Sequence, residues 1–415
     1  MSLIPGKTLE DLEFSQVLKH ISKYALNDLG KESCLMLKPL FNLIQIKFNL
    51  ELVSEFNSSF QNKNVIPSHD FFDCNPYFKT LKIEDSVLEI NAFNKISSNT
   101  KMANQLITFF SKFKTYYPNL FNLSKEIEIN KEIISKINSV IDRFDVIKDN
   151  ASSELYEIRN KIKNLKNIIT LNFNKTLSNY STLGYLDDIK ESVYENIRVL
   201  AVKAMYRKKI KGYILGASKT GSIVFIEPES VNIHSLELKN LLYEENEEIR
   251  KILTELTFYL RPYLNLITKH QIFLLDIDSI YARAKYAEEI NGIKPDLNEN
   301  NTLDLKKAYH PLLYVTNKKE KKDTLPQDVY INNKNRIIII SGPNAGGKSI
   351  TLKTIGLIQL MFQSGILIPV DRKSSLFYYD QILTDIGDNQ SIENHLSTYS
   401  YRLNKMKFFL KKCNN

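Results

Sequence analysis

A complete phosphate-binding motif lies towards the carboxyl end of the sequence, where it matches GxxxxGK[ST] at every position. Its residues are Gly342, Pro343, Asn344, Ala345, Gly346, Gly347, Lys348 and Ser349. The glycines allow the backbone to turn tightly and to bring its N–H groups close to phosphate oxygens. Lys348 is the expected cation for the β- and γ-phosphates of ATP, and Ser349 is the expected Mg²⁺ ligand. The motif therefore predicts a binding site for ATP and Mg²⁺.

Two elements are needed to position this loop. Four consecutive isoleucines at 337–340 predict a central parallel strand that is covered on both faces. The apolar pattern over 349–363 predicts a helix whose N-terminal dipole faces the bound anion. A chance glycine-rich turn would not need this strand and helix, so we interpret the motif as a nucleotide site.

Hydrolysis of ATP needs further acidic residues, which hold the magnesium shell and orient the attacking water. After Lys348 the sequence contains no hydrophobic strand that ends in Asp-Glu. Asp371 follows Pro369, whereas Asp385 and Asp388 belong to a separate segment. The sequence thus supports nucleotide binding and leaves open whether this chain is an ATP hydrolase.

Positive charge is concentrated in one short stretch of a chain whose net charge is +9. Between positions 203 and 219 there are six basic residues and no acidic ones: Lys203, Arg207, Lys208, Lys209, Lys211 and Lys219. A local concentration of this kind is typical of a surface that binds a nucleic-acid backbone. A solvated basic loop without a ligand is the alternative.

Two apolar seams at helical spacing flank this basic stretch. The first consists of Leu155, Ile158, Ile162, Leu165 and Ile169, and the second of Leu238, Leu242, Ile249, Leu253, Leu256 and Leu260. They predict an antiparallel pair of long helices, or else two amphipathic helices on separate cores. Short β-branched runs at 197–202, 212–216 and 222–226 predict strands between the seams. The basic residues would then lie on a small β-unit at the tip of a helical pair.

Composition sets the broad class. A chain of 415 residues, 43% hydrophobic and 25% charged, predicts a foldable protein of two or three domains. No apolar run reaches the roughly 18 to 20 residues that span a bilayer, and the N-terminus resembles no signal peptide, so we expect a cytoplasmic location without membrane partners. Three scattered cysteines and six dispersed histidines predict neither a disulfide framework nor a zinc site.

Several segments together resemble the MutS family of DNA-handling ATPases, specifically its MutS-II branch, in the family's order along essentially the whole chain. They include SGPNAGGKSITLKTIGLIQLMFQSGILIPV, TDIGDNQSIENHLSTYS, GSIVFIEP, VIKDNASSELYEIR, KPDLNENNTLDLKKAYHPLL and KTLEDLEFSQVLKHIS. The resemblance implies that His310 lies near the nucleotide, although Tyr309 stands where an arginine is usual. It also implies that Ser397 and Thr398 form a signature that reaches a partner's nucleotide across a dimer.

The expected fold is a multidomain α and α/β protein. It has a helical core, antiparallel coiled-coil levers, a small β-containing clamp and the first half of a P-loop (ABC-like) α/β ATPase domain. The expected divisions are an N-terminal helical core at 1–125, a lever helix at 126–180, the clamp at 181–232, the returning lever and core helices at 233–292, and the incomplete ATPase domain at 293–415. The family's acidic strand and C-terminal nuclease module have no counterpart here, so we expect a complementing C-terminal polypeptide or a fragment of a longer gene.

The resemblance implies a DNA-binding ATPase of the mismatch repair family, which acts on recombination or repair intermediates and suppresses recombination. Double-stranded or branched DNA is the expected partner, and a homodimer the expected assembly. Phe225-Ile226-Glu227 matches the Phe-x-Glu wedge of mismatch readers, but it lies within the clamp-like segment, so we interpret the match as coincidental. The alternatives are a non-catalytic truncated subunit or interaction protein, and a clamp ATPase that acts on ribosomes or structured RNA.

Overall fold

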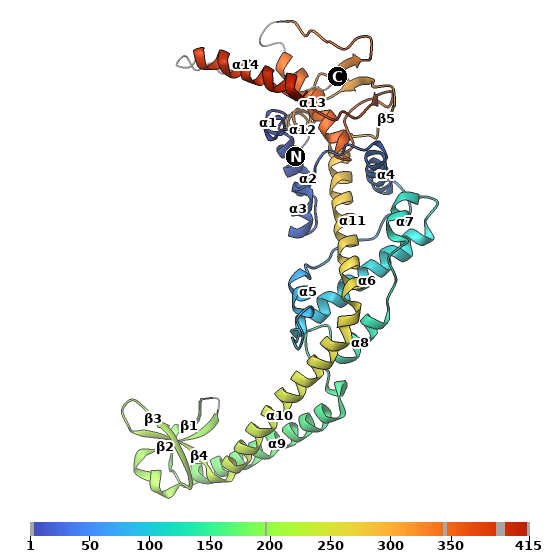
Figure 1. Ribbon diagram of the computed structural model, residues 1–415. Helices are drawn as coiled ribbons and strands as arrows, with labels where there is room; N and C mark the ends of the chain where they lie inside the picture. The colour runs from blue at the N-terminus through green and yellow to red at the C-terminus, as the bar shows by residue number, and fades with distance from the viewer. Residues whose placement is uncertain (1–3, 196, 343–346, 387–394, 413–415) are drawn as a thin grey trace. The chain divides into compact units, whose positions relative to one another are not determined.

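The computed structural model describes residues 4–195, 197–342, 347–386 and 395–412, the last range without the side chains of 395–402 and 412. The chain divides into two compact units (Figure 1). Unit 1 comprises residues 1–74, 98–131 and 265–415, and unit 2 comprises residues 75–97 and 132–264. No helix in the described ranges is both long and apolar enough to cross a membrane.

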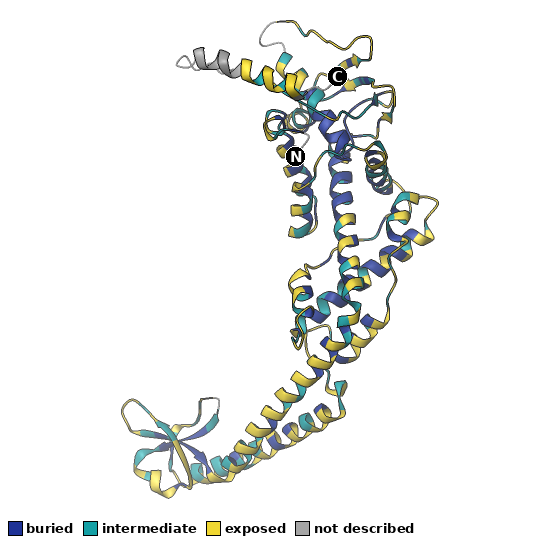
Figure 2. Cartoon of the chain, viewed as in Figure 1, coloured by how far each residue is buried: buried dark blue, intermediate teal, exposed yellow. Residues whose placement is uncertain are grey.

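Unit 1 is mostly helical and is built around one long central helix. That helix is α11 (Leu264–Ile290), and buried residues dominate it over much of its length (Figure 2). The other helices of unit 1 are α1 (Gly6–Asp11), α2 (Phe14–Ser22), α3 (Asp28–Leu35), α4 (Leu43–Ser59), α7 (Pro118–Ser124), α12 (Pro311–Glu320), α13 (Lys348–Gln363), α14 (His395–Lys412) and most of α6 (Ile90–Lys112). Because apolar side chains cover α11 on several sides, it forms the core of the unit.

Polar groups on α11 fix the elements around it. The Arg283 guanidinium is buried and donates to the carbonyl oxygens of Ser279, at 3.2 Å, and Gly365, at 3.1 Å. Burial lowers the pKa of Arg283 to about 10. The carboxylate of Asp278, also buried, accepts the N–H of Leu26 at 3.1 and 3.2 Å. These bonds connect α11 to segments that are distant in sequence.

His270 on α11 makes the stability of unit 1 depend on pH. Its Nε2 donates to the Glu128 carbonyl oxygen at 2.8 Å, and burial lowers its pKa below 6.5. Below pH 6.5 the unfolded chain therefore gains a proton that the folded chain does not bind. The free energy of unfolding should fall, by up to about 1.4 kcal/mol per pH unit, as the pH drops from there to the lowered folded pKa.

Urea unfolding followed by circular dichroism at about pH 7.5 and about pH 5.5 measures this loss. His270→Gln, which is neutral at both pH values, should lose less stability between them than the wild type does. The variant should still show the part of the pH-dependent stability loss that is due to His20 and His310, because burial also lowers their pKa values. An equal loss in wild type and variant would contradict the role of His270.

The sheet of unit 1 differs from the predicted one. Its strands are β5 (Asp296–Leu297), β6 (Leu303–Ala308), β7 (Gln327–Ile331) and β8 (Ser375–Leu376), in the order β5-β8-β6-β7. Only β5 and β8 pair in parallel. The prediction of a buried strand at 337–340 is wrong for this structure: the segment is extended but is not a strand, and Ile337 and Ile339 are 82% and 88% exposed. Among the described residues no strand lies beside it to supply hydrogen bonds and cover its faces.

Unit 2 contains the predicted pair of long helices. They are α9 (Ser153–Thr182) and α10 (Glu229–Leu260). Ser152, the N-cap of α9, donates its hydroxyl to Glu248 at 2.7 Å, whereas Thr176 near the other end of α9 lies 3.1 Å from Ser230, measured between their hydroxyl oxygens. The start of α9 therefore contacts a late part of α10, and the end of α9 contacts the start of α10, which confirms an antiparallel pair.

The seam between α9 and α10 is confirmed on α9 and needs correction on α10. Ile162 and Leu165 pack against Leu241, whereas Leu242, assigned to the seam from sequence, is 37% exposed. Leu238, also assigned to the seam, packs against this cluster as predicted. A strict seven-residue repeat drifts around a helix of 3.6 residues per turn, which accounts for the local shift by one position. The polar interruption at Glu245 is an ion pair, because its Oε1 lies 2.8 Å from Nε of Arg159.

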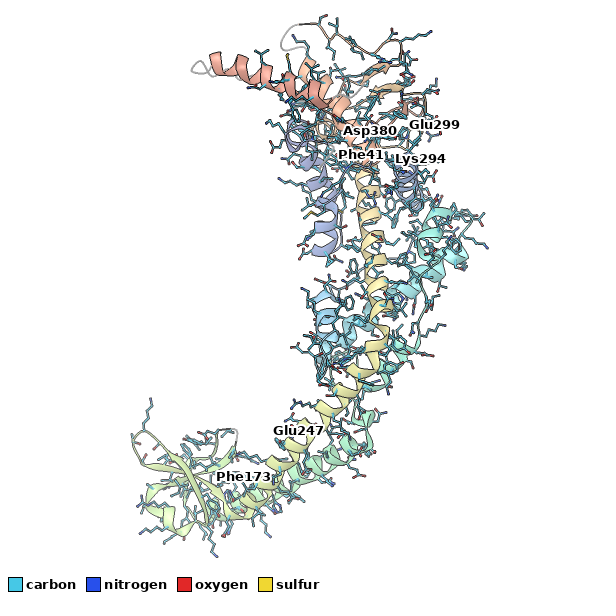
Figure 3. The ribbon with its side chains drawn as sticks, in the orientation of Figure 1. Phe41, Phe173, Glu247, Lys294, Glu299 and Asp380 are labelled. Carbon is cyan, nitrogen blue, oxygen red and sulfur yellow. The ribbon has the colours of Figure 1, made fainter. Side chains whose placement is uncertain are left out.

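A four-stranded antiparallel sheet separates α9 from α10 along the chain. Its strands are β1 (Leu186–Tyr194), β2 (Ile197–Lys203), β3 (Gly212–Ala217) and β4 (Ile223–Pro228), in the order β1-β2-β4-β3. The last three confirm the predicted strands. The sequence did not indicate β1, since LDDIKESVY has no apolar alternation. One face of the sheet packs on Phe173 of α9, which is labelled in Figure 3. The remaining helices of unit 2 are α5 (Asn75–Leu81), α8 (Glu132–Val140) and the first turns of α6.

Candidate nucleotide and nucleic-acid sites

Both described ends of the phosphate motif have glycines with positive φ. Gly347 is the N-cap of α13 and has φ of 80°, and Gly342 has φ of 150°; both are values that favour glycine. The Lys348 ammonium donates to the Gly342 carbonyl oxygen at 2.6 Å, and Ser349 in the first turn is exposed. The other predicted loop residues, Pro343, Asn344, Ala345 and Gly346, lie outside the described residues.

The helix α13 is firmly held in unit 1. Its second half is buried, from Leu357 to Gln363. At the middle of the helix, a Cβ at Gly356 would lie 2.7 Å from Leu12 Cδ2, so a larger residue here would require the buried Leu12 side chain to shift. Gln363 donates to the carbonyl oxygens of Leu40 and Tyr379, each at 3.0 Å. The first turn, with Lys348 and Ser349, therefore projects from a rigid helix.

An ion pair joins α13 to the N-terminal segment, and the sequence did not indicate it. Lys353 Nζ lies 2.7 Å from Oε1 of Glu13. Glu13 is the N-cap of α2 and adopts a left-handed conformation with φ of 57°. The two residues are 340 positions apart, and neither belongs to the phosphate motif, so no signal in the sequence paired them.

His310 is buried close to this ion pair. Its Nδ1 accepts the N–H of Leu313 at 3.4 Å, which caps α12. Burial lowers the pKa of His310, while Glu13 raises it and Lys353 lowers it. The structure thus places His310 near the base of α13, in a capping position.

The signature segment is described only in part. Residues 387–394 lie outside the described residues, and Ser397 and Thr398 lie in α14, in the part whose side chains are not described. Next to this gap, the Thr384 hydroxyl donates to Asp11 at 2.9 Å, and Lys405 Nζ lies 2.9 Å from Asp385 Oδ1. The helix α14 is thereby joined to the N-terminal end of unit 1.

The acidic residues after the loop have other partners. Asp371 accepts the N–H of Lys373 at 3.0 Å and so stabilises a turn, and Asp385 pairs with Lys405. Asp388 lies outside the described residues. Within the described ranges no group of three or more His, Cys, Asp and Glu side chains could hold a metal ion.

The predicted basic residues lie on one side of the small sheet in unit 2. We call four of them the basic cluster: Arg207, Lys208, Lys209 and Lys211, all exposed, on or just after the 3₁₀ segment η2 (Ala204–Lys209). At the start of η2, the Ala204 N–H bonds to Ser222; after its end, Gly212 pairs with Pro228. The segment therefore crosses the sheet from one end of β4 to the other.

The two remaining basic residues lie at one end of the basic cluster. Lys203 ends β2 opposite Ile223, and Lys219 is exposed in the tight turn between β3 and β4. On the far edge of the sheet, β1 carries acidic residues, of which Glu191 is paired with Arg198 at 2.6 Å. Acidic residues thus gather on β1, whereas the basic cluster lies on and just after η2.

Comparison with known proteins places these features in context. The family model described as MutS domain V matches residues 338–415. A protein named Endonuclease MutS2 from Clostridium perfringens is 32% identical over 412 residues, which cover 99% of this chain and 51% of that protein. Proteins of the same name from Caldicellulosiruptor bescii and Lactobacillus johnsonii are 33% and 30% identical, and 49% and 50% of their lengths are covered. The chain thus spans about half the length of the curated relatives it matches.

Proposed function

The chain belongs to the MutS family, and from this premise we propose that it binds ATP·Mg²⁺ in unit 1 and DNA through unit 2. Its substrates would be recombination or repair intermediates that contain double-stranded or branched DNA. The observation that carries the proposal is the combination, in one chain, of a complete phosphate motif with an exposed basic cluster beside a pair of long helices.

The nucleotide half rests on groups that fit a polyphosphate. In the described part of the phosphate motif, the two positions with positive φ are Gly342 and Gly347. A Cβ at either position would meet no atom within 4 Å. The first hydrogen bond within α13 is donated by Thr351 to Gly347, so the N–H groups before it point out of the helix end. The Lys348 ammonium would exchange its hydrogen bond to the Gly342 carbonyl oxygen for one to a phosphate oxygen, and Ser349 would bind Mg²⁺. Mg²⁺ would neutralise phosphate charge at this site.

This chain would bind ATP, whereas ATP hydrolysis would need acidic residues other than Asp371 and Asp385. Asp371 and Asp385 are engaged in a turn and an ion pair, and relatives of twice this length include segments without a counterpart here. Ser397 and Thr398 would act across a dimer, on the nucleotide of a second copy. Suppression of recombination would follow if bound nucleotide controlled how long the chain stays on branched DNA.

The DNA half rests on exposed charge and local geometry. Lysine and arginine side chains that are free of acidic neighbours on their own segment bind phosphates and release counterions. The same contacts would hold structured RNA or a ribosome, because a cationic surface recognises backbone charge. Competition of ribosomal particles against duplex DNA for the purified chain distinguishes the two targets.

Lys348→Ala is expected to weaken the binding of ATP·Mg²⁺ about 10- to 100-fold, since a charge-assisted hydrogen bond contributes roughly 1.5 to 3 kcal/mol. Isothermal titration of ATP into the full chain measures this affinity. Binding of duplex DNA in the absence of nucleotide should stay within about twofold of wild type, because the basic cluster is in the other unit.

The matched control is Lys373→Ala, which removes a lysine from an exposed turn of the same unit and should leave ATP affinity unchanged. Wild type that binds no ATP, or equal affinities in wild type and Lys348→Ala, would contradict the nucleotide half of the proposal.

A further inference from the structure

Three tyrosines form a stacked row beside the basic cluster. Tyr180 near the end of α9 stacks on Tyr185 with ring centres 6.2 Å apart, and Tyr185 stacks on Tyr206 of η2 at 4.8 Å. The ring planes are within 26° of parallel in both pairs. All three rings are half-buried. The ammonium of Lys209 lies 5.5 Å from the centre of Tyr185 and 5.7 Å from that of Tyr206, so a residue of the basic cluster covers this row.

A cleft opens at the Tyr180 end of the row. Its volume is about 420 Å³, within the roughly 300 to 1,000 Å³ that is typical of small-molecule sites. It is formed by the last turns of α9, the start of β3 and the first turn of α10. The lining residues are Asn172, Lys175, Thr176, Asn179, Tyr180, Lys211, Pro228, Glu229 and Ser230.

The spacing of residues on α9 explains why the cleft combines polar and aromatic groups. Asn172, Thr176 and Asn179 are separated by four and three positions, so they share one face of the helix. Phe173 and Tyr180 occupy the neighbouring face, which packs on the core of the sheet. Tyr180 therefore stands at the boundary: it packs against the core of the sheet and also lines the cleft.

The far wall of the cleft is held in place by hydrogen bonds. The hydroxyl oxygens of Thr176 and Ser230 are 3.1 Å apart. The Glu229 N–H donates to the carbonyl oxygen of Lys211 at 3.1 Å, which fixes the start of α10 against the entry to β3. The cleft thus lies between elements that are already bonded to each other, as a preformed site requires.

The chemistry of the lining matches an unpaired nucleotide. An aromatic ring offers a stacking surface to any exposed base, carboxamides and hydroxyls bond to base edges, and two ammonium groups attract phosphates. Glu229 also lines the cleft, and its carboxylate can accept from an exocyclic amino group. Bases within a duplex are already stacked and paired, so only an unpaired base can insert beside Tyr180.

We propose that this cleft binds an unpaired nucleotide of a DNA strand, whose base stacks on Tyr180 and whose phosphates lie on Lys175 and Lys211. The inference rests on the proposed DNA function and gives it a substrate class: branched DNA at the point where a duplex opens into a single strand. The basic cluster contains Lys211 and begins at this cleft. It would therefore hold the adjoining duplex while the cleft holds the first unpaired base.

The test compares two DNA ligands by fluorescence anisotropy with the full chain: a forked duplex with single-stranded arms, and a blunt duplex of the same length. Tyr180→Leu should weaken binding of the fork about 5- to 100-fold, because stacking on one aromatic side chain contributes roughly 1 to 3 kcal/mol. Binding of the blunt duplex should not change. Tyr180→Phe, which keeps the ring, should bind the fork as wild type does.

Tyr213→Leu is the matched control, since Tyr213 is 55% exposed on β3 of the same sheet and outside the row. A 2-aminopurine base at the first unpaired position reports stacking directly: its fluorescence should be quenched by wild type and by Tyr180→Phe, and not by Tyr180→Leu. Retained binding of the blunt duplex by Tyr180→Leu separates loss of stacking from general misfolding of the variant.

Four results would overturn the inference. The cleft holds no unpaired base if Tyr180→Leu binds the fork as tightly as wild type does, or if its affinities for the fork and the blunt duplex fall to the same extent. In both cases the proposed DNA function stands. If a forked RNA of the same sequence binds more tightly than the DNA fork, the ligand is RNA. If wild type binds neither DNA ligand, the proposed DNA function fails as well.

Discussion

Replacement of all four residues of the basic cluster with alanine is expected to weaken binding of a blunt DNA duplex about a thousandfold at about 0.1 M salt. Each phosphate contact releases counterions and contributes about 0.9 to the slope of log affinity against log salt. Loss of four contacts should therefore flatten that slope by roughly 3 to 4 units. All four side chains are exposed and lie on one short segment, which lets one duplex contact them together.

The control removes the same amount of charge from exposed positions of unit 1. It replaces with alanine Lys318, Lys319, Lys322 and Lys334. Because salt screens charges that lie far from the DNA, this variant should bind within a few-fold of wild type and keep the wild-type salt slope. Anisotropy titrations across a salt series measure both quantities. Equal losses in the two variants would show that net charge, and not the basic cluster, determines affinity.

Asp278→Ala is expected to lower the free energy of unfolding of unit 1 by about 3 to 5 kcal/mol. The Asp278 side chain is wholly buried, and both of its oxygens accept the N–H of Leu26. Nε2 of His69 lies 3.3 Å from Oδ1 of the same carboxylate. A Cβ at Gly30 would overlap Oδ2, so the chain is fitted closely around this group. Removal of the carboxylate leaves buried donors unpaired and opens a cavity.

Two further variants separate these causes. Asp278→Asn keeps an acceptor of similar shape and should cost only about 1 to 2 kcal/mol. Asp323→Ala, at an exposed position, should stay within about 0.5 kcal/mol of wild type. Urea unfolding followed by circular dichroism gives the free energies, and hydrogen exchange of the Leu26 amide reports the local bond. A stable Asp278→Ala protein with a protected Leu26 amide would show that the carboxylate is dispensable.

The helical pair shows what periodicity can predict. The spacing of Leu155, Ile162 and Leu165 identified the contacting face of α9, because the position of each side chain around a helix follows from its residue number. On α10, Leu238 packs as predicted, but the next contact is made by Leu241 and not Leu242, since the exact register depends on how two helices meet. The role of Glu245 also needed the partner, because an acidic residue in an apolar seam is stable only opposite a cation such as Arg159.

The isoleucine run at 337–340 shows where pattern alone fails. Its composition predicts a buried central strand, but such a strand needs neighbours on both edges and layers on both faces. The described residues supply neither, and the segment is left exposed. β1 is the opposite case: its charged sequence gives no strand pattern, and pairing with β2 makes it one.

Patterns along the chain sufficed to identify the phosphate motif with its following helix, the position of the basic cluster, and the helix–strand–helix order of unit 2. All of these are encoded in residues near one another along the chain, so propensity and spacing suffice. Only the tertiary structure revealed the Asp278 bonds to Leu26, the Glu13 ion pair with Lys353, and the tyrosine row beside its cleft. Each depends on segments that meet only when the chain folds, and the free energy of such a contact depends on both partners together.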